Sequence, residues 1–249
     1  MGRIGMIDWG IGGIGIYRRL KASFPQTAVT YFSDTGFTPY GKTTRRELIE
    51  RLERVVRFLQ QREVSRVVIA CNAASTVVDE LRCEGIEVSG VIKPAIELAA
   101  KLKPRDLGLI GGRRTVVSGV YRRGLAAEGI TLKQRIAQPL SGLIEKGEID
   151  SPVLHIESQR ILKPLATCSH ILLACTHYPA IAGVLSRYVS PTTQLIDPAD
   201  AVVSRLDLLR TLADQPDIFL TTGSTKEMRQ AAKAAWAVDL KGPQQVRGL

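Results

Sequence analysis

Val67–Ser75 reads VVIACNAAS and Ile171–Pro179 reads ILLACTHYP, and these two stretches decide the predicted fold. In each stretch an apolar run is followed directly by a cysteine and then by polar side chains. The first run, Arg66–Ala70 (RVVIA), is rich in β-branched residues, which is typical of a strand buried on both faces of a parallel sheet. Because such strands alternate along the chain with helical patterns, the sequence predicts a parallel α/β architecture.

A faint internal repeat links the two stretches. Ile4–Ile7 (IGMI) resembles Leu107–Ile110 (LGLI), and each segment runs into a glycine turn. The matched cysteine lies 66 residues after Gly5 in the first half and 67 residues after Gly108 in the second. Ligands of open α/β sheets bind outside the carboxyl ends of the strands. If the halves pack about a pseudo-twofold axis, the two thiols face each other across one cleft.

The repeat predicts two similar domains. The first is expected to contain residues 1–100 plus 206–249, and the second residues 101–205, with a boundary near Pro104. The segment after residue 206 is therefore expected to return and pack on the first half. The candidate site lies in the cleft between the two domains.

Further helices and strands follow from the apolar periodicity. Thr44–Leu59 has apolar residues at helical spacing, and Thr44 and Glu47 at its start have the spacing of a capping box. Ser224 is followed by Glu227 at the same spacing, which predicts another helix start. The remaining predicted elements are one helix and two strands, over Ile14–Phe24, Arg3–Ile7 and Ala28–Phe32.

Composition excludes several classes of protein. Of the 249 residues 45% are hydrophobic, and the chain has no run of about 18 apolar residues that would predict a membrane-spanning helix. The formal net charge is +10, but the basic residues occur as scattered pairs and only 5% of residues are aromatic, so a nucleic-acid partner is not expected. With four cysteines and no export signal, we expect free thiols in a reducing cytoplasm.

Two cofactor chemistries fit the sequence poorly. The turn Gly10–Gly13 (GIGG) follows a predicted strand, but it lacks the full spacing of a dinucleotide-binding loop, and no acidic residue ends the second strand. Three histidines and the lack of a C-x₂-C pair provide no zinc-ligand spacing. We therefore expect neither a cofactor nor a metal ion.

The four cysteines divide into two kinds. Two of them, Cys83 and Cys168, are expected to be packing residues, since a free cysteine usually behaves as a small hydrophobe. Cys71 and Cys175 differ because polar residues follow them directly, Asn72 after the first and Thr176 with His177 after the second. A single Cys–His nucleophile would leave the second matched cysteine without a role.

These motifs resemble those of the cofactor-independent aspartate/glutamate racemase superfamily, and most closely those of its glutamate racemases. Ala70–Ser75 (ACNAAS) is similar to the A-C-N-T-A-S of that family, and Ala174–Pro179 (ACTHYP) is similar to its G-C-T-H-Y-P. The similarity extends to Gly223, and the other matching blocks follow in the family's order: Ile7–Gly13, Asp34–Thr35, Pro39–Gly41, Gly90–Ala95, Thr115 with Ser118 and Tyr121, Asp197, and Thr222–Gly223.

The resemblance implies an isomerase that transfers protons with two thiols. Racemisation removes a proton from one face of Cα and returns one on the other face, which suits a thiolate and a thiol on opposite sides. The resemblance further implies that Asp8 assists Cys71, that His177 assists Cys175, and that Glu145 contributes as well. The implied substrate-binding residues are Trp9, Pro39, Tyr40, Gly41, Asn72, Ala73, Thr115 and Thr176.

The implied reaction is the conversion of L-glutamate to D-glutamate for peptidoglycan. The expected binding partner is a small amino-acid substrate, and a homodimer is possible. Three positions depart from the family pattern: Trp9 and Pro198 each replace a serine, and Ala73 replaces a threonine. The changes at positions 9 and 73 remove hydroxyls that face the substrate in glutamate racemases. Two alternatives therefore stay open, a racemase or isomerase of another amino or α-substituted acid and a catalytically silent relative that binds a ligand or nucleic acid.

Overall fold

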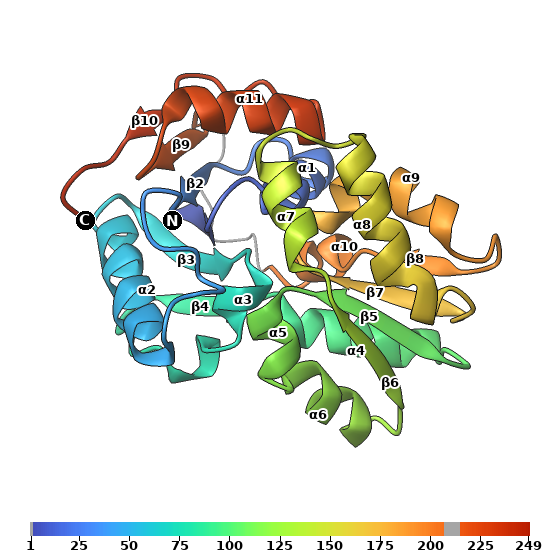
Figure 1. Cartoon of the computed structure of the whole chain (residues 1–249). Helices are drawn as coiled ribbons and strands as arrows, with labels where there is room; N and C mark the ends of the chain where they lie inside the picture. The colour runs from blue at the N-terminus through green and yellow to red at the C-terminus, as the bar shows by residue number, and fades with distance from the viewer. Residues whose placement is uncertain (1, 207–214) are drawn as a thin grey trace.

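The structure is a computed structural model that describes residues 2–206 and 215–249. Within these ranges the strands form two sheets, ordered β10-β9-β2-β1-β3-β4 and β6-β5-β7-β8, and every strand pair is parallel (Figure 1). The strands of the first sheet are β1 Arg3–Asp8, β2 Val29–Ser33, β3 Val64–Ile69, β4 Glu87–Gly90, β9 Ile218–Thr221 and β10 Gln244–Gln245. Those of the second sheet are β5 Leu107–Gly111, β6 Leu132–Ile136, β7 His170–Ala174 and β8 Gln194–Ile196.

The two sheets repeat one topology. The order β2-β1-β3-β4 within the first sheet is matched by β6-β5-β7-β8 in the second, so β1 corresponds to β5 and β3 to β7. Every residue of β1 and of β5 is buried, as expected for central strands covered by helices on both faces. The predicted fold class, two similar parallel-sheet α/β halves, is confirmed.

Helices connect the strands, as parallel pairing requires. Thr44 accepts a hydrogen bond from the N–H of Glu47 and returns its own N–H to the Glu47 carboxylate, so the predicted capping box is confirmed. The predicted start at Ser224 is confirmed as well. The helices are α1 Ile14–Ser23, α2 Arg45–Gln60, α3 Asn72–Ser75, α4 Ile92–Leu102, α5 Arg113–Val117, α6 Val120–Ala127, α7 Gln138–Glu145, α8 Pro152–Leu162, α9 Ala182–Leu185, α10 Ala199–Val203 and α11 Thr225–Trp236. Short 3₁₀ turns lie at η1 Val78–Glu80, η2 Lys163–Leu165, η3 Tyr178–Ile181 and η4 Ser186–Tyr188.

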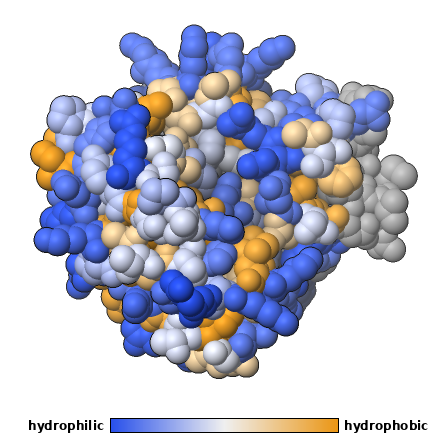
Figure 2. All heavy atoms as spheres, turned by 90° about the vertical axis from the view of Figure 1, so that its right-hand side faces the viewer, coloured by the Kyte–Doolittle hydropathy of each residue, from blue (hydrophilic) through white to orange (hydrophobic). Residues whose placement is uncertain are grey.

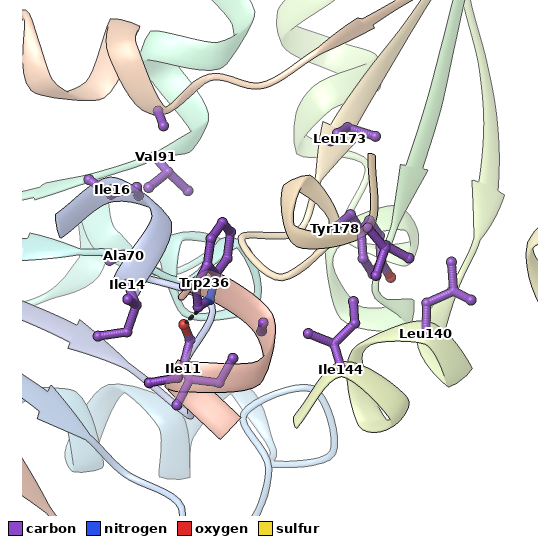
Figure 3. Close-up of a cluster of buried hydrophobic side chains, with 14 of the residues drawn as sticks. Ile11, Ile14, Ile16, Ala70, Val91, Leu140, Ile144, Leu173, Tyr178 and Trp236 are labelled. Carbon is purple, nitrogen blue, oxygen red and sulfur yellow. Dashed lines mark hydrogen bonds between the residues drawn. The ribbon is translucent and has the colours of Figure 1, made fainter. Parts of the chain in front are cut away.

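The last part of the chain returns to the first sheet. Strand β9 pairs with β2, and α11 ends in Trp236, whose Nε1–H donates to the carbonyl of Ile11 at 2.9 Å. Figure 3 shows this bond within a cluster of buried hydrophobic side chains that also contains Ile14 and Tyr178. The same hydrophobic cluster contains Ile4 of β1 and Leu173 of β7, so apolar contacts connect the two halves. The domain boundaries at 100/101 and 205/206 stay a prediction.

One face of the molecule carries its apolar side chains in small groups (Figure 2). Figure 2 shows hydrophobic residues scattered among hydrophilic ones on the face that lies to the right in Figure 1. Val153 and Ile156 of α8 are the most exposed of that helix's large apolar side chains, at 54% and 63%. Within residues 2–206 and 215–249, the structure contains no helix of the length and apolarity needed to cross a bilayer.

Candidate active site

A cavity of about 410 Å³ opens between the two sheets, at the carboxyl ends of their central strands. Its wall combines residues from β1, the loop after β2, and the segments that follow β3, β5, β6 and β7. The predicted site residues on this wall are Asp8, Trp9, Pro39, Tyr40, Gly41, Cys71, Asn72, Ala73, Thr115, Cys175, Thr176 and His177. Glu145, the remaining predicted residue, lies behind His177.

The first thiol belongs to Cys71, which follows β3 and precedes α3. It is 8% exposed, and the fully buried carboxylate of Asp8 lies beside it at the end of β1. Asp8 is held in place because its Oδ1 accepts the N–H of Trp9 and its Oδ2 accepts the N–H of Gly13, both at 2.7 Å. Burial raises the pKa of Asp8, although the His177 charge and the hydrogen bonds from Cys71 and the Gly13 N–H lower it.

The pKa of Cys71 favours the protonated thiol. Burial raises this pKa well above its ordinary value, and the negative charge of Asp8 raises it further. The sulfur of Cys175 also contributes, which places the second thiol within electrostatic reach of the first. In the free protein, Cys71 is therefore suited to donate a proton.

The second thiol belongs to Cys175, which follows β7 and is half-buried. Its Sγ lies 3.8 Å from Nδ1 of His177, and Nε2 of His177 lies 2.7 Å from Oε2 of Glu145. The same Glu145 oxygen accepts the N–H of Ile11 at 3.1 Å. Burial opposes a charge on His177, but the Cys175 sulfur and the Glu145 carboxylate raise its pKa well above the ordinary value. An imidazolium at this position can balance a thiolate on Cys175.

The glycine turn after β1 provides the space that this arrangement needs. A Cβ on Gly10 would lie 2.3 Å from Oε2 of Glu145, and one on Gly12 would lie 2.5 Å from Nδ1 of His177. Both distances are shorter than side chains tolerate, so these positions bring the backbone close to the acid–base pair. The sequence pattern marks this turn but indicates no function for its glycines, because only the folded chain shows what lies opposite them.

Unpaired polar atoms lie on the cavity wall near the thiols. Asn72 accepts a hydrogen bond from the hydroxyl of Tyr121 at 2.6 Å, which directs its amide group. In the part of the chain that the structure describes, Nδ2 of Asn72 and Oγ1 of Thr115 are buried without a hydrogen-bond partner. Buried polar groups are rarely left unpaired, so these atoms are available to a polar ligand. Tyr121 matched the family motif, yet its role in directing Asn72 was not predicted.

Residues 39–42 of the loop Pro39–Thr43 form another part of the wall. The hydroxyl of Tyr40 donates to Oδ2 of buried Asp34 at 2.8 Å, and Arg51 donates to both oxygens of that carboxylate. Among the described residues, the backbone N–H groups of Tyr40 and Gly41 have no acceptor. These two groups can therefore donate to an anion in the cavity.

Two of the departures from the family pattern lie on the same wall. Trp9 lines the cavity, and its indole N–H donates to the carbonyl of Phe37 at 2.9 Å, so this donor is already occupied. Ala73 adds only a methyl group to the wall. The wall also contains residues that sequence analysis did not select, because no local pattern marks them: Lys42, Gly112, Gln138, Pro139, Ser141 and Gly142.

Two further cysteines lie away from the cavity. Cys168 is 2% exposed and belongs to the hydrophobic core, while Cys83 is partly buried against the apolar cluster under α2. Both positions agree with the expected packing role. No group of three or more His, Cys, Asp or Glu side chains arranged to hold a metal ion occurs in residues 2–206 or 215–249.

Comparison with known proteins places this geometry in a family. The sequence pattern of the Asp/Glu/Hydantoin racemase family matches residues 4–206. A glutamate racemase from Desulforudis audaxviator is 34% identical over 218 residues, which cover 84% of this chain and 80% of that protein. One from Herpetosiphon aurantiacus is 32% identical and covers 94% of each chain.

Solved structures of glutamate racemases share the fold of this chain. The glutamate racemase of Thermus thermophilus, solved in complex with β-chloro-D-alanine, superposes with a TM-score of 0.84 at 27% identity and covers 98% of this chain and 96% of that one. A glutamate racemase of Bacillus anthracis has the same fold, with a TM-score of 0.87 at 24% identity and coverage of 98% of this chain and 97% of that one. The chain thus belongs to the Asp/Glu/Hydantoin racemase family.

Proposed function

We propose that this protein is a cofactor-independent racemase that inverts Cα of glutamate, with Cys71 and Cys175 as the two proton-transfer groups. One observation carries the proposal: two thiols from equivalent strand ends of the two halves reach the same cavity, and each has its own acid–base partner. Asp8 serves the first thiol, and the pair formed by His177 and Glu145 serves the second.

The unequal surroundings of the thiols suit the start of the reaction. Cys175, beside a positively charged His177, is the proposed base that removes the Cα proton. Cys71, which is held as a neutral thiol, is the proposed acid that returns a proton on the opposite face. In the reverse direction the roles exchange, and Asp8 would accept the proton that Cys71 must lose. Exclusion of water from the cavity would strengthen the electrostatic interactions of the two thiols with their partners.

The unpaired donors support an amino acid with two carboxylates. Asn72 and Thr115, each with an unpaired polar atom, form one set near the thiols, and the N–H groups of Tyr40 and Gly41 form another. Thr176 lies on the same wall, with its hydroxyl 3.5 Å from Oδ2 of Asp8. Two separate sets of donors fit the two anionic ends of glutamate. D-glutamate for peptidoglycan is the proposed product. A cytoplasmic location and a homodimer are further proposals, which cell fractionation and sedimentation would test.

Proton exchange at Cα tests the reaction itself. Purified protein is incubated with L-glutamate and, separately, with D-glutamate in D₂O without added pyridoxal phosphate or metal. Deuterium should enter Cα of both enantiomers, and the optical rotation should decay to zero. A protein that incorporates no deuterium from glutamate, aspartate or a larger amino acid would refute the racemase proposal.

Trp9 and Ala73 favour a second candidate, the same reaction on another amino or α-substituted acid. Trp9 forms part of the wall and its indole N–H is bound to Phe37, so it supplies a large side chain without a free indole donor. A screen of amino acids for Cα exchange would separate the candidates: faster turnover of a different substrate would favour the second. Retention of RNA or DNA that weakens steeply with salt would instead favour a silent, nucleic-acid-binding relative.

A further inference from the structure

Arg114 connects the second half of the molecule to the cavity loop of the first half. It lies on α5, directly before Thr115 of the cavity wall. Its Nε–H donates to the carbonyl of Tyr40 at 2.8 Å, and its Nη2 donates to the carbonyl of Thr43. One half-buried guanidinium thus binds two carbonyls of the loop Pro39–Thr43, which lies more than 70 positions away in the sequence.

The first of these bonds acts on the peptide unit that carries the Gly41 donor. The carbonyl of Tyr40 and the N–H of Gly41 belong to one planar peptide group, and no peptide bond among the described residues is cis. In a trans peptide the two groups point in opposite directions, so a bond that fixes the carbonyl also fixes the N–H. A cation on the carbonyl also polarises the peptide and makes its N–H a stronger donor.

Other contacts already fix the rest of the loop Pro39–Thr43. The Tyr40 side chain is 1% exposed and is bound to Asp34, and the N–H groups of Lys42 and Thr43 donate to the carbonyl of Pro39 at 2.7 and 3.2 Å. None of these contacts determines the rotation of the Tyr40–Gly41 peptide itself. Arg114 contacts that peptide directly, and its planar fork matches two carbonyls better than an ammonium group would.

We propose that Arg114 is a positioning residue that orients the Tyr40–Gly41 peptide across the mouth of the cavity, so that the Gly41 N–H is presented to a carboxylate of the substrate. This inference rests on the proposed function, because it takes an amino acid with carboxylates as the ligand. Arg114 and Thr115 are neighbours on α5. The same helix therefore carries the Thr115 hydroxyl at the cavity and, through Arg114, holds the peptide with the Gly41 N–H.

The test compares Arg114→Ala and Arg114→Lys with the wild type and with Arg113→Ala. Arg113 is the matched control, since it has the same charge, lies on the same helix and is exposed. Because the Gly41 N–H would bind the carboxylate in the ground state and in the transition state alike, Arg114→Ala should raise KM for glutamate about tenfold with kcat within about threefold. Arg114→Lys should give an intermediate KM, since an ammonium group holds one carbonyl less rigidly.

Two measurements separate positioning from a general loss of structure. Hydrogen exchange of the segment 39–43 should become faster in Arg114→Ala and stay unchanged in Arg113→Ala, while the thermal midpoints of the two variants differ by no more than about 4 °C. Binding of glutarate, a dicarboxylate that cannot be racemised, should weaken about tenfold in Arg114→Ala.

The outcomes are distinct. An unchanged glutarate affinity in Arg114→Ala, an equal loss in Arg113→Ala, or full recovery in Arg114→Lys would overturn the positioning role, the last because charge alone would then suffice. If the wild type exchanges no Cα proton but loses glutarate affinity through Arg114→Ala, the proposed reaction fails and the positioning role stands.

Discussion

Substitution of Gly10 by alanine tests whether the Glu145–His177 pair supports the thiol of Cys175. A Cβ at position 10 would lie 2.3 Å from Oε2 and 2.4 Å from Oε1 of Glu145, far inside normal contact. The obstacle is the end of a flexible side chain, so the carboxylate rather than the backbone is expected to move. It must then give up His177 Nε2 at 2.7 Å and the N–H of Ile11 at 3.1 Å.

The size of the effect follows from these two bonds. A hydrogen bond that involves a charged group contributes about 1.5–3 kcal/mol, and about 1.4 kcal/mol corresponds to a tenfold change in rate. Loss of the bond to His177 should therefore lower kcat/KM for glutamate about 10- to 100-fold. The free energy of unfolding should fall by a similar amount, so circular dichroism must show that the variant is folded at the assay temperature.

The assay is a double-mutant cycle measured as deuterium entry at Cα. Gly10→Ala, Glu145→Ala and the double variant are compared with Gly183→Ala, a control position where an added Cβ meets nothing within 4 Å. If Gly10→Ala acts by displacing the carboxylate, it should cost nothing further once Glu145 is absent. Losses that multiply in the double variant, or wild-type activity in Gly10→Ala, would refute the reasoning.

Three further predictions follow from the site. Cys71→Ser and Cys175→Ser should each abolish racemisation but retain Cα proton exchange of one enantiomer, a different one for each variant. The controls Cys83→Ser and Cys168→Ser should leave the racemisation rate within about twofold of the wild type. Wild-type racemisation in Cys71→Ser and Cys175→Ser would contradict the two-thiol mechanism. Trp9→Ser combined with Ala73→Thr should raise kcat/KM for glutamate about tenfold if the missing hydroxyls limit it, and an unchanged or lower rate counts against that account. Folding raises the pKa values of His177 and Cys71. The folded protein therefore keeps a proton that the unfolded chain releases from the histidine above about pH 6.5 and another that it releases from the cysteine above about pH 8.5. The free energy of unfolding should therefore fall as pH rises through this range, by up to about 1.4 kcal/mol per pH unit for one proton, and in urea titrations His177→Gln should flatten the first part of that fall.

The strand-end cysteines show how far local sequence can lead. A β-branched apolar run, a cysteine and then polar residues predict a buried strand that ends at a ligand site, because parallel strands present their carboxyl ends at one edge. The recurrence of that pattern at nearly equal spacing was sufficient to predict two similar halves with Cys71 and Cys175 in matching places. Capping at Thr44 was predictable for the same reason, since its partners lie within one turn of helix.

Other features depend on contacts between residues far apart in the chain. The close approach of Glu145 to Gly10, the bond from Trp9 to the Phe37 carbonyl and the contact of Arg114 with Tyr40 join residues separated by 28 to 135 positions. Periodicity reports which face of an element is buried, but it contains no information on which side chain lies opposite. The sequence by itself determined the two halves and their two thiols. The resemblance to the racemases already implied which groups assist each thiol. The tertiary structure alone decided the distances and burial of those groups and which donors are left free, because these arise only when the two sheets pack together.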